Sequence, residues 1–272
     1  MTTLMTRRWR LAVVGLGLLT GCASTPSVPP AARSELAATG KLRVGLILSN
    51  QVLVTRDPQT GELRGVTVSL GKSLARRIGV PFEPVGYPNP SALVQSFGRN
   101  EWDIAFLAFD PARAREVDFS PPYMVVDNTY LVPTGSKVRS VEMADQPGVK
   151  IAVPERSAPD LFLSRTLKAA EIVRVPGGAD AAIEVLRSGR ADAYAENAHM
   201  LSLYSDRLPG SRVLEGRYTL IQHAVAIPKG RSAAAEYVRQ FIEESKSDGT
   251  IRDAIAQAGL RRTAVATPLP AK

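Results

Sequence analysis

The chain has 272 residues and a formal net charge of +8, with 44% hydrophobic and 22% charged residues. This composition is that of a globular protein and excludes a wholly disordered chain, and the length suits one large domain or two lobes. The positive charge is spread along the chain and is not clustered with aromatic residues. It therefore does not predict a nucleic-acid-binding surface.

The N-terminus is typical of an export signal. Three arginines within residues 7–10 precede the apolar run 11–19, which is too short to cross a bilayer but suits a secretory signal peptide over residues 1–21. The following Leu-Thr-Gly-Cys quartet resembles a bacterial lipobox, in which Cys22 becomes the lipidated first residue. Cys22 is the only cysteine, so an intramolecular disulfide is excluded. We expect a periplasmic or other extracytoplasmic protein, anchored to a membrane through Cys22, with residues 22–35 as a flexible tether.

The first part of the folded chain alternates between strand and helix patterns. Apolar periodicity and Gly, Pro and Asn punctuation predict a strand at 41–48, a hairpin or loop at 55–65, a helix at 66–79, a strand at 80–87, a helix at 89–102 and a strand at 103–109. This order predicts a mainly parallel sheet covered by helices.

A second unit of the same kind follows. The pattern predicts an extended crossing at 127–135, then strands at 149–155, 171–176 and 191–197 with helices at 158–170 and 178–189, a return crossing at 218–230 and two final helices within 231–260. We therefore expect an α/β protein with two lobes and a ligand cleft between them. The expected boundaries are 36–130 plus 222–262 for lobe 1, 131–221 for lobe 2 and 263–272 for a frayed tail.

Several segments resemble one known family. The stretches KLRVGL, GELRGVTVSLGKSLARRIGV, NEWDIAFLAFDPARAREVDFSPPY, GVKIAVPERSA, VLRSGRADAYAEN and HAVAIPKG fall in the order seen in amino-acid-type solute-binding proteins of bacterial ABC importers, family 3, over about residues 36–260. The resemblance implies a periplasmic-binding-protein-like (type II) fold with two hinge crossings. It also implies a monomeric receptor, without enzyme activity or cofactor, that binds a small carboxylate-bearing solute by lobe closure and delivers it to a membrane permease.

In this family, the arginine five positions before an Asp-Phe-Ser segment binds the carboxylate of the solute, and here that residue is Arg113. A guanidinium suits this role because its paired donors match a carboxylate. The alternative for Arg113 is a surface ion pair with Asp110 or Glu116. We also expect Asp110 to lie at the ligand site. Arg115 falls on a solvent-facing position.

Other positions depart from the family pattern in lobe 1. A glycine and a threonine that usually contact an α-amino acid are replaced by Phe106 and Ala108, and the aromatic residue that usually covers the solute is replaced by Asn50. Phe106, Phe109 and Tyr87 could supply apolar contacts to a less polar solute, or belong to the core.

Lobe 2 departs from the pattern as well. Its usual Gly-Thr is Arg156-Ser157, followed by Ala158, so a hydroxyl remains at the expected helix start. The acidic partner of the solute ammonium falls on Asn197, whose amide cannot neutralise a cation, and Glu196 stands one place earlier. The expectation is an acid without a standard α-amino group, unless a register shift makes Glu196 the ammonium partner.

The sequence offers little for catalysis. It shows no metal-ligand spacing, no phosphate-binding loop and no nucleophile elbow, and its two histidines, His199 and His223, lie apart. One enzymatic alternative has the same fold, because cyclohexadienyl dehydratases resemble these receptors and use a carboxylic acid in the cleft as general acid. Glu196 beside Arg113 could imitate that pair. A third possibility is a sensor that reports its ligand to a membrane signalling receptor.

Overall fold

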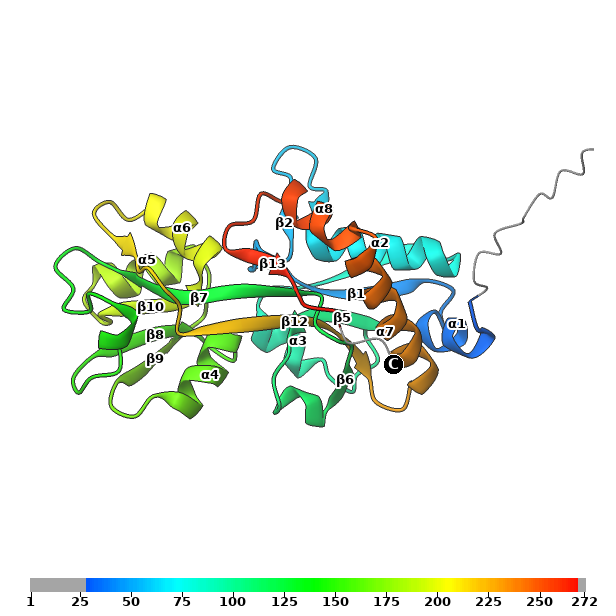
Figure 1. The fold of residues 1–272 in the computed structure, drawn as a ribbon, viewed down its shortest axis with the longest axis horizontal. Coiled ribbons are helices and arrows are strands. Elements are labelled where there is room, and N and C mark those ends of the chain that lie inside the picture. Colours follow the sequence, from blue (N-terminus) through cyan, green and yellow to red (C-terminus); the bar gives the residue numbers. More distant parts are fainter. Residues whose placement is uncertain (1–27, 269–272) are drawn as a thin grey trace, which may run out of the picture.

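The computed structural model describes residues 28–268. The expected signal peptide and Cys22 lie outside this range. Figure 1 shows two α/β halves placed end to end, with two long strands running between them. The expected two-lobed α/β architecture is confirmed.

Lobe 1 is built around three parallel strands. β1 (Leu42–Ile47) lies between β4 (Phe82–Tyr87) and β5 (Ile104–Ala108). The expected hairpin is formed by β2 (Thr55–Arg56) and β3 (Leu63–Arg64), and the helices between the strands are α2 (Val66–Ile78) and α3 (Pro90–Gln95). The order strand, helix, strand, helix, strand is as the sequence predicts.

Helix α2 shows how the sequence sets these boundaries. Val66, Leu70, Leu74 and Ile78 recur at helical spacing, and all four are buried. The helix ends at Gly79, which has φ +69° and whose N–H donates to the last carbonyls of the helix. Only glycine takes this left-handed conformation without steric cost, so the end of the helix is fixed by one residue.

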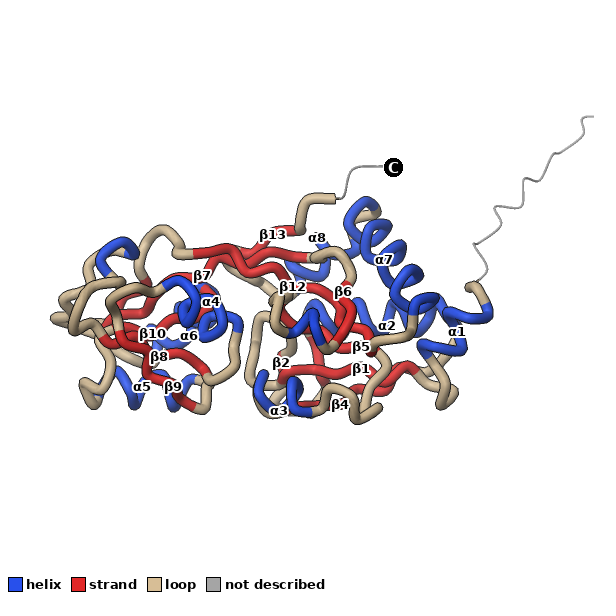
Figure 2. Tube along the Cα trace, turned by 90° about the horizontal axis from the view of Figure 1, so that it is seen from below, coloured by secondary structure: helices blue, strands red, loops and turns tan. Residues whose placement is uncertain are grey.

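Two long antiparallel strands connect the lobes. β7 (Met124–Val132) and β12 (Thr219–Pro228) pair with each other at the centre of an 11-stranded sheet with the order β4-β1-β5-β12-β7-β10-β8-β9. Figure 2 shows both strands along one side of the molecule, between the two lobes. Short strands complete the sheet: β6 (Val117–Phe119) on β12, and β11 (Arg212–Val213) and β13 (Thr263–Val265) on β7. The two expected crossings are confirmed.

Lobe 2 repeats the parallel arrangement. β8 (Lys150–Pro154) pairs with β9 (Glu171–Val175) and with β10 (Ala193–Asn197), and each strand is followed by a helix: α4 (Ala158–Thr166), α5 (Ala179–Arg187) and α6 (Ala198–Asp206). Ile151 and Val153 face one apolar core, and Ala152 faces the other, so both faces of this sheet are covered. The sequence interpretation missed α6, because Asn197 ends the strand and caps the helix without any intervening turn residue.

Both ends of the folded part are more ordered than expected. Helix α1 (Pro30–Leu36) lies within the expected tether; its Ala32 and Leu36 are buried, and the Glu35 carboxylate accepts from the N–H of Ala234, in α7 (Ser232–Ser247), at 2.7 Å. Strand β13 follows α8 (Thr250–Gln257) and occupies part of the expected frayed tail. Both predictions were wrong there, because tertiary packing stabilises segments too short to show a periodic pattern.

None of the helices within residues 28–268 is long and apolar enough to span a membrane.

Candidate functional site

A cavity of about 40 Å³ lies where residues from both lobes meet. In lobe 2, helices α4, α5 and α6 all begin beside it, with Ser157, Gly178 and Asn197 as their N-caps. Parallel α/β units place ligands in this position, at the carboxyl ends of strands and near the positive ends of helices. Among the sequence-predicted site residues, the cavity is lined by Asn50, Ala108, Arg113, Ser157, Ala158, Glu196 and Asn197.

Arg113 is the cation of this cavity. It lies in a single 3-10 turn (Arg113–Arg115) after β5 and is only 4% exposed. Its Nη1 donates to the carbonyl of Ala108 in lobe 1 at 2.8 Å, and its Nη2 donates to the carbonyl of Arg156 in lobe 2 at 2.7 Å. Burial lowers its pKa to about 10, so the side chain remains positively charged at neutral pH. Arg115, by contrast, is exposed, as the sequence predicts.

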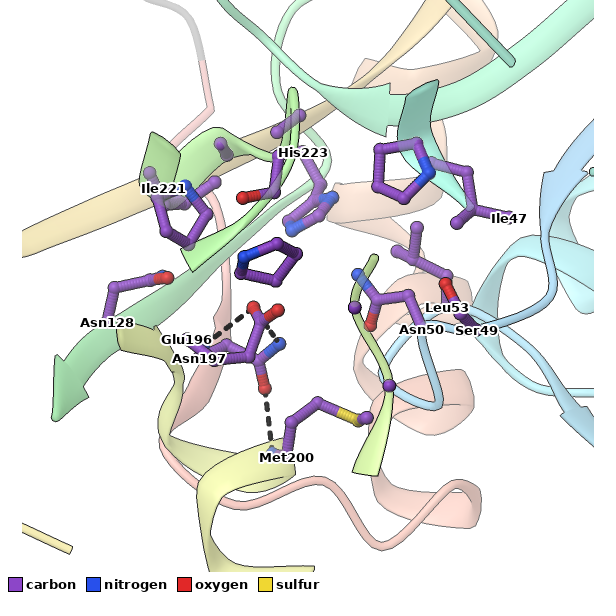
Figure 3. Close-up of a pocket in the computed structure, with 18 of the residues that line it drawn as sticks. Ile47, Ser49, Asn50, Leu53, Asn128, Glu196, Asn197, Met200, Ile221 and His223 are labelled. Atoms are coloured by element: carbon purple, nitrogen blue, oxygen red, sulfur yellow. Dashed lines mark hydrogen bonds between the residues drawn. The ribbon is translucent and has the colours of Figure 1, made fainter. Parts of the chain in front are cut away.

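Glu196 is the anion of the cavity. Its Oε1 accepts from the backbone N–H of Asn197 at 2.9 Å and from the Asn197 amide nitrogen at 3.0 Å. Removal from water raises the pKa of Glu196 to about 7, although these two hydrogen bonds favour the ionised form. The side-chain oxygen of Asn197 is already used within the protein, because it caps α6 by accepting from the N–H of Met200 at 2.9 Å (Figure 3). The acidic group that faces the cavity is therefore Glu196.

The start of α4 supplies the second lobe 2 wall. The Ser157 hydroxyl oxygen caps this helix by accepting from the N–H of Asp160 at 3.2 Å, and Ser157 is 4% exposed. Arg156 precedes it with φ +56°, a left-handed conformation that glycine normally takes. Arg156 thus has the left-handed backbone conformation expected of the glycine that the family pattern has at this position. Its carbonyl accepts the hydrogen bond from Arg113 Nη2.

His223 is a cavity residue to which the sequence interpretation gave no role. It lies on β12 between Ala108 of β5 and Met124 of β7, and it is 5% exposed. Figure 3 shows its imidazole and the Glu196 carboxylate directed into the same pocket. Burial, together with the charge of Arg113, lowers the pKa of His223 to about 3, so the imidazole is neutral. The available signal was a histidine, next to Gln222, in an otherwise mainly apolar crossing strand.

Three expected site residues lie outside the cavity. Phe106 is 1% exposed and packs edge-on against Tyr123, two residues before Ala108, which ends β5 and lines the cavity. Tyr87 is also buried, and its hydroxyl donates to Glu101 at 2.6 Å. Asp110 forms an ion pair with Arg165 of lobe 2 at 2.8 Å. The structure therefore places these three side chains away from the cavity.

The remaining lining is uncharged. Arg113 and Glu196 are the only charged side chains among the described residues that line the cavity. Around them lie amide, hydroxyl and apolar groups, many of which the sequence interpretation missed: Ile47, Ser49, Leu53, Asn128, Met200, Tyr204 and Ile221. Within residues 28–268 there is no cluster of His, Cys, Asp and Glu that could hold a metal ion, and His199 binds the backbone N–H of Arg261 away from this cavity.

Residues 42–258 match the bacterial extracellular solute-binding proteins, family 3. The chain belongs to this family. Its match spans both lobes, both crossing strands and every residue of the cavity described above. Membership makes the chain a solute-binding protein and accounts for a cavity between two lobes.

Two curated relatives have contrasting roles. The chain is 25% identical to the ABC transporter glutamine-binding protein GlnH of Bacillus subtilis, over 90% of this chain and 94% of the relative. It is also 25% identical to the cyclohexadienyl dehydratase of Pseudomonas aeruginosa, over 71% of this chain and 74% of the enzyme. A binding protein and an enzyme thus share this fold at similar identity.

Solved structures support the same fold. An ancestral amino-acid-binding protein, AncCDT-1, described as a precursor of cyclohexadienyl dehydratase, superposes with a TM-score of 0.70 at 27% identity, covering 83% of this chain and 97% of its own. A mutant of the arginine-binding protein of T. maritima superposes with a TM-score of 0.71 at 24% identity, over 84% and 99% of the two chains. The type II periplasmic-binding-protein fold that the sequence predicts is confirmed.

Proposed function

We propose that this protein is the receptor of an ABC importer for an α-amino acid with an uncharged side chain. The carboxylate of the solute binds Arg113 and its ammonium binds Glu196, so that one solute bridges the two lobes. The observation that carries this proposal is the presence of Glu196 in the cavity that Arg113 lines. It restores the ammonium partner that Asn197 alone would not provide.

The charge count of the cavity limits the solute. One buried cation and one buried anion are balanced by a zwitterion, and each extra charge on the solute would be buried without a partner. The amide and hydroxyl groups of Ser49, Asn50 and Asn128 suit a small polar side chain, in keeping with the glutamine-binding relative. Solutes with cationic or anionic side chains are disfavoured on the same ground.

Lobe closure supplies the mechanism. Because Arg113 belongs to lobe 1 and Glu196 to lobe 2, a bound zwitterion favours the closed form by its additional contacts there. A cavity of about 40 Å³ has room for only a few water molecules, so the lobes must part to admit a solute of amino-acid size. The permease would then receive the closed, loaded form.

A thermal-shift screen of residues 23–272 against the standard amino acids tests the proposal, with matched 2-hydroxy acids as controls. A solute that binds only the folded state raises the melting temperature. Uncharged amino acids should shift it, and their hydroxy analogues, which lack the ammonium, should not. Equal shifts from both series would contradict the role of Glu196, and a permease assay with and without the protein separates import from signalling.

The enzymatic alternative has its own test. Glu196, with a pKa of about 7 next to a carboxylate-binding arginine, has the protonation behaviour that a general acid needs, and an enzyme relative exists at 25% identity. We propose binding without turnover, because this acid is explained by ammonium recognition. Formation of phenylpyruvate or phenylalanine from prephenate or arogenate at micromolar protein would contradict this.

The proposal includes anchoring through lipidated Cys22, with the signal peptide removed and the short segment before α1 as the tether. Wild-type cells fed radiolabelled palmitate should label the protein, and the variant Cys22→Ser should lose the label and leave the membrane fraction. Labelling that survives this substitution would contradict the anchor assignment.

A further inference from the structure

Two buried nitrogen atoms in the cavity have no hydrogen-bond partner: Nε of Arg113 and Nδ1 of His223. Within residues 28–268, the other buried side-chain atoms without partners are the hydroxyls of Tyr123, Tyr194 and Tyr218, none of which lines this cavity. A buried donor left without a partner costs free energy, so it is uncommon in a folded protein. Both atoms belong to residues that line one cavity, which points to a ligand group that would satisfy both.

The hydrogen bonds of Arg113 leave it with one unpaired nitrogen, which is too few to bind both oxygens of a carboxylate. Nη1 donates to Ala108 and Nη2 to Arg156, both backbone carbonyls, so the guanidinium is held by one contact from each lobe. Nε alone is left without a partner. A carboxylate has two oxygen atoms that each accept hydrogen bonds, and a single N–H meets only one of them.

His223 is placed to supply the second donor. Its backbone is fixed on both sides, because β12 pairs with β5 at Ala108 and with β7 at Met124. Its ring lies 6.5 Å from the ring of Tyr123, centroid to centroid. His223 pairs with Ala108, and the Ala108 carbonyl accepts from Arg113 Nη1, so His223 and Arg113 flank the same residue and line the same cavity.

We propose that His223 donates its Nδ1–H to one oxygen of the solute carboxylate while Arg113 Nε–H donates to the other, so that His223 is a second carboxylate-binding residue. This inference rests on the proposed function, which supplies the carboxylate. Since the carboxylate is an acceptor only, the tautomer that binds it is the neutral Nδ1–H form. Arg113 and neutral His223 together then offer one positive charge and two donors, which matches a monocarboxylate.

A pair of substitutions separates the donor from the ring. His223→Phe keeps an aromatic ring against Tyr123 but removes the donor, whereas His223→Asn loses the ring and keeps an amide nitrogen close to the position of Nδ1. The probe is whichever of the twenty standard L-amino acids binds the wild-type protein most tightly in calorimetry. We expect His223→Phe to bind it at least about 10-fold more weakly and His223→Asn to lose less than half of that effect on a logarithmic scale.

The control variant is His199→Phe. His199 is the only other histidine in the sequence, and it does not line the cavity. This variant should bind like the wild type. Binding by His223→Phe within twofold of the wild type, with a normal melting transition, would overturn the inference and leave the proposed function standing. If the wild type binds none of the twenty amino acids, the proposed function falls and this inference falls with it.

A spectroscopic measurement covers the case in which His223→Phe fails to fold. With only two histidines in the chain, ¹⁵N-histidine labelling of the wild type yields two imidazoles, which His199→Gln assigns. In the complex with the same amino acid, the Nδ1 of His223 should carry a proton that exchanges slowly with water. A complex in which Nδ1 is unprotonated and Nε2 carries the proton would overturn the proposal.

Discussion

The polar side chains of the two cavity walls differ in whether they have hydrogen-bond partners. In lobe 2, the side-chain oxygens of Ser157 and Asn197 each accept a hydrogen bond as a helix cap, and the Asn197 amide also donates to Glu196. In lobe 1, Arg113 and His223 each keep one buried nitrogen without a partner. The two capping side chains of lobe 2 thus already have hydrogen-bond partners, whereas we propose that the two lobe 1 nitrogens gain theirs from the solute.

This difference assigns separate roles to the lobes. Unpaired donors in lobe 1 favour capture of the carboxylate, because each gains a hydrogen bond that the empty protein lacks. Lobe 2 adds a charge at Glu196, held in place by Asn197, and the N-termini of α4, α5 and α6. We therefore expect loss of Arg113 in lobe 1 to weaken binding most, and loss of Glu196 in lobe 2 to weaken it less and to alter its pH dependence.

The largest effect is expected for Arg113→Ala. This change removes the one cation among the described residues that line the cavity, and with it the hydrogen bond from lobe 1 to the carbonyl of Arg156. Affinity for the best amino acid should fall at least 100-fold, about 3 kcal/mol, in calorimetry. Arg115→Ala, two residues along and exposed, is the matched control and should bind normally. Unchanged affinity in Arg113→Ala would remove the basis of the carboxylate assignment.

Glu196→Gln should weaken binding and stabilise the empty protein. The side chain keeps an oxygen that can accept from Asn197 but loses the charge that binds ammonium, so we expect a loss of about 10- to 100-fold. The wild-type carboxyl has its pKa raised from 4.5 to about 7, so the folded state holds the proton more tightly than the unfolded state does. Wild-type stability therefore falls as pH rises from about 4.5 to 7, by about 1 to 3 kcal/mol.

Thermal melts of the ligand-free Glu196→Gln variant and wild type, at pH 8 and at pH 4.5, measure this effect on stability. Glu196→Gln should melt higher than the wild type at pH 8 and close to it at pH 4.5. A variant that is less stable at pH 8 would show that the ionised Glu196 is well solvated in the empty protein.

The pH dependence of wild-type binding gives a smaller effect with the same origin. An ammonium group needs the ionised Glu196, which at a pKa of about 7 is mostly protonated at pH 5.5 and mostly ionised at pH 8. Affinity should therefore increase by about 30-fold across this range. His223 does not add to the slope, since its pKa of about 3 keeps it neutral throughout. The Glu196→Gln variant should show a flat profile, and a flat wild-type profile would argue against ammonium binding by Glu196.

The ion pair between Asp110 and Arg165 joins the lobes outside the cavity and should matter less. Arg165 is half exposed, so the pair contributes under about 1 kcal/mol, and Asp110→Asn should change affinity less than about fivefold. Its carbonyl can still accept from the N–H of Ala112. Small-angle scattering should show a slightly more open ligand-free protein. Asp180→Asn, which breaks an ion pair within lobe 2, is the control and should leave the scattering unchanged.

The strands and most helices could be predicted from the sequence because their signals are local. Helix α2 has apolar residues at regular spacing and a glycine at its end, and β5 is an unbroken apolar run. Helix α1 could not be predicted in this way, since its stability depends on contacts with α7 at the other end of the chain. Short elements fixed by tertiary contacts leave no local pattern.

The site could be predicted in part. The spacing that singled out Arg113 is a local motif, and the structure buries this residue at the cavity, while its contact with a carboxylate stays a prediction. Phe106 shares a face of β5 with Ala108 but packs against Tyr123, and the sequence does not show how far along the strand the cavity extends. His223 could not be found, since its proximity to Arg113 arises only when β12 pairs with β5 across more than a hundred residues.

Arg156→Gly is expected to have the smallest effect. The family pattern has glycine here, and Arg156 holds φ +56°, so glycine would remove a steric cost of about 1 kcal/mol while adding a similar amount of unfolded-state entropy. Melting temperature and affinity should both stay close to wild-type values, the latter within twofold. Arg156→Ala keeps the strained backbone and tests the side chain alone. A tenfold loss in both variants would show that the exposed Arg156 side chain takes part in binding, whereas unchanged binding would mean that lobe 2 presents only a backbone carbonyl to Arg113.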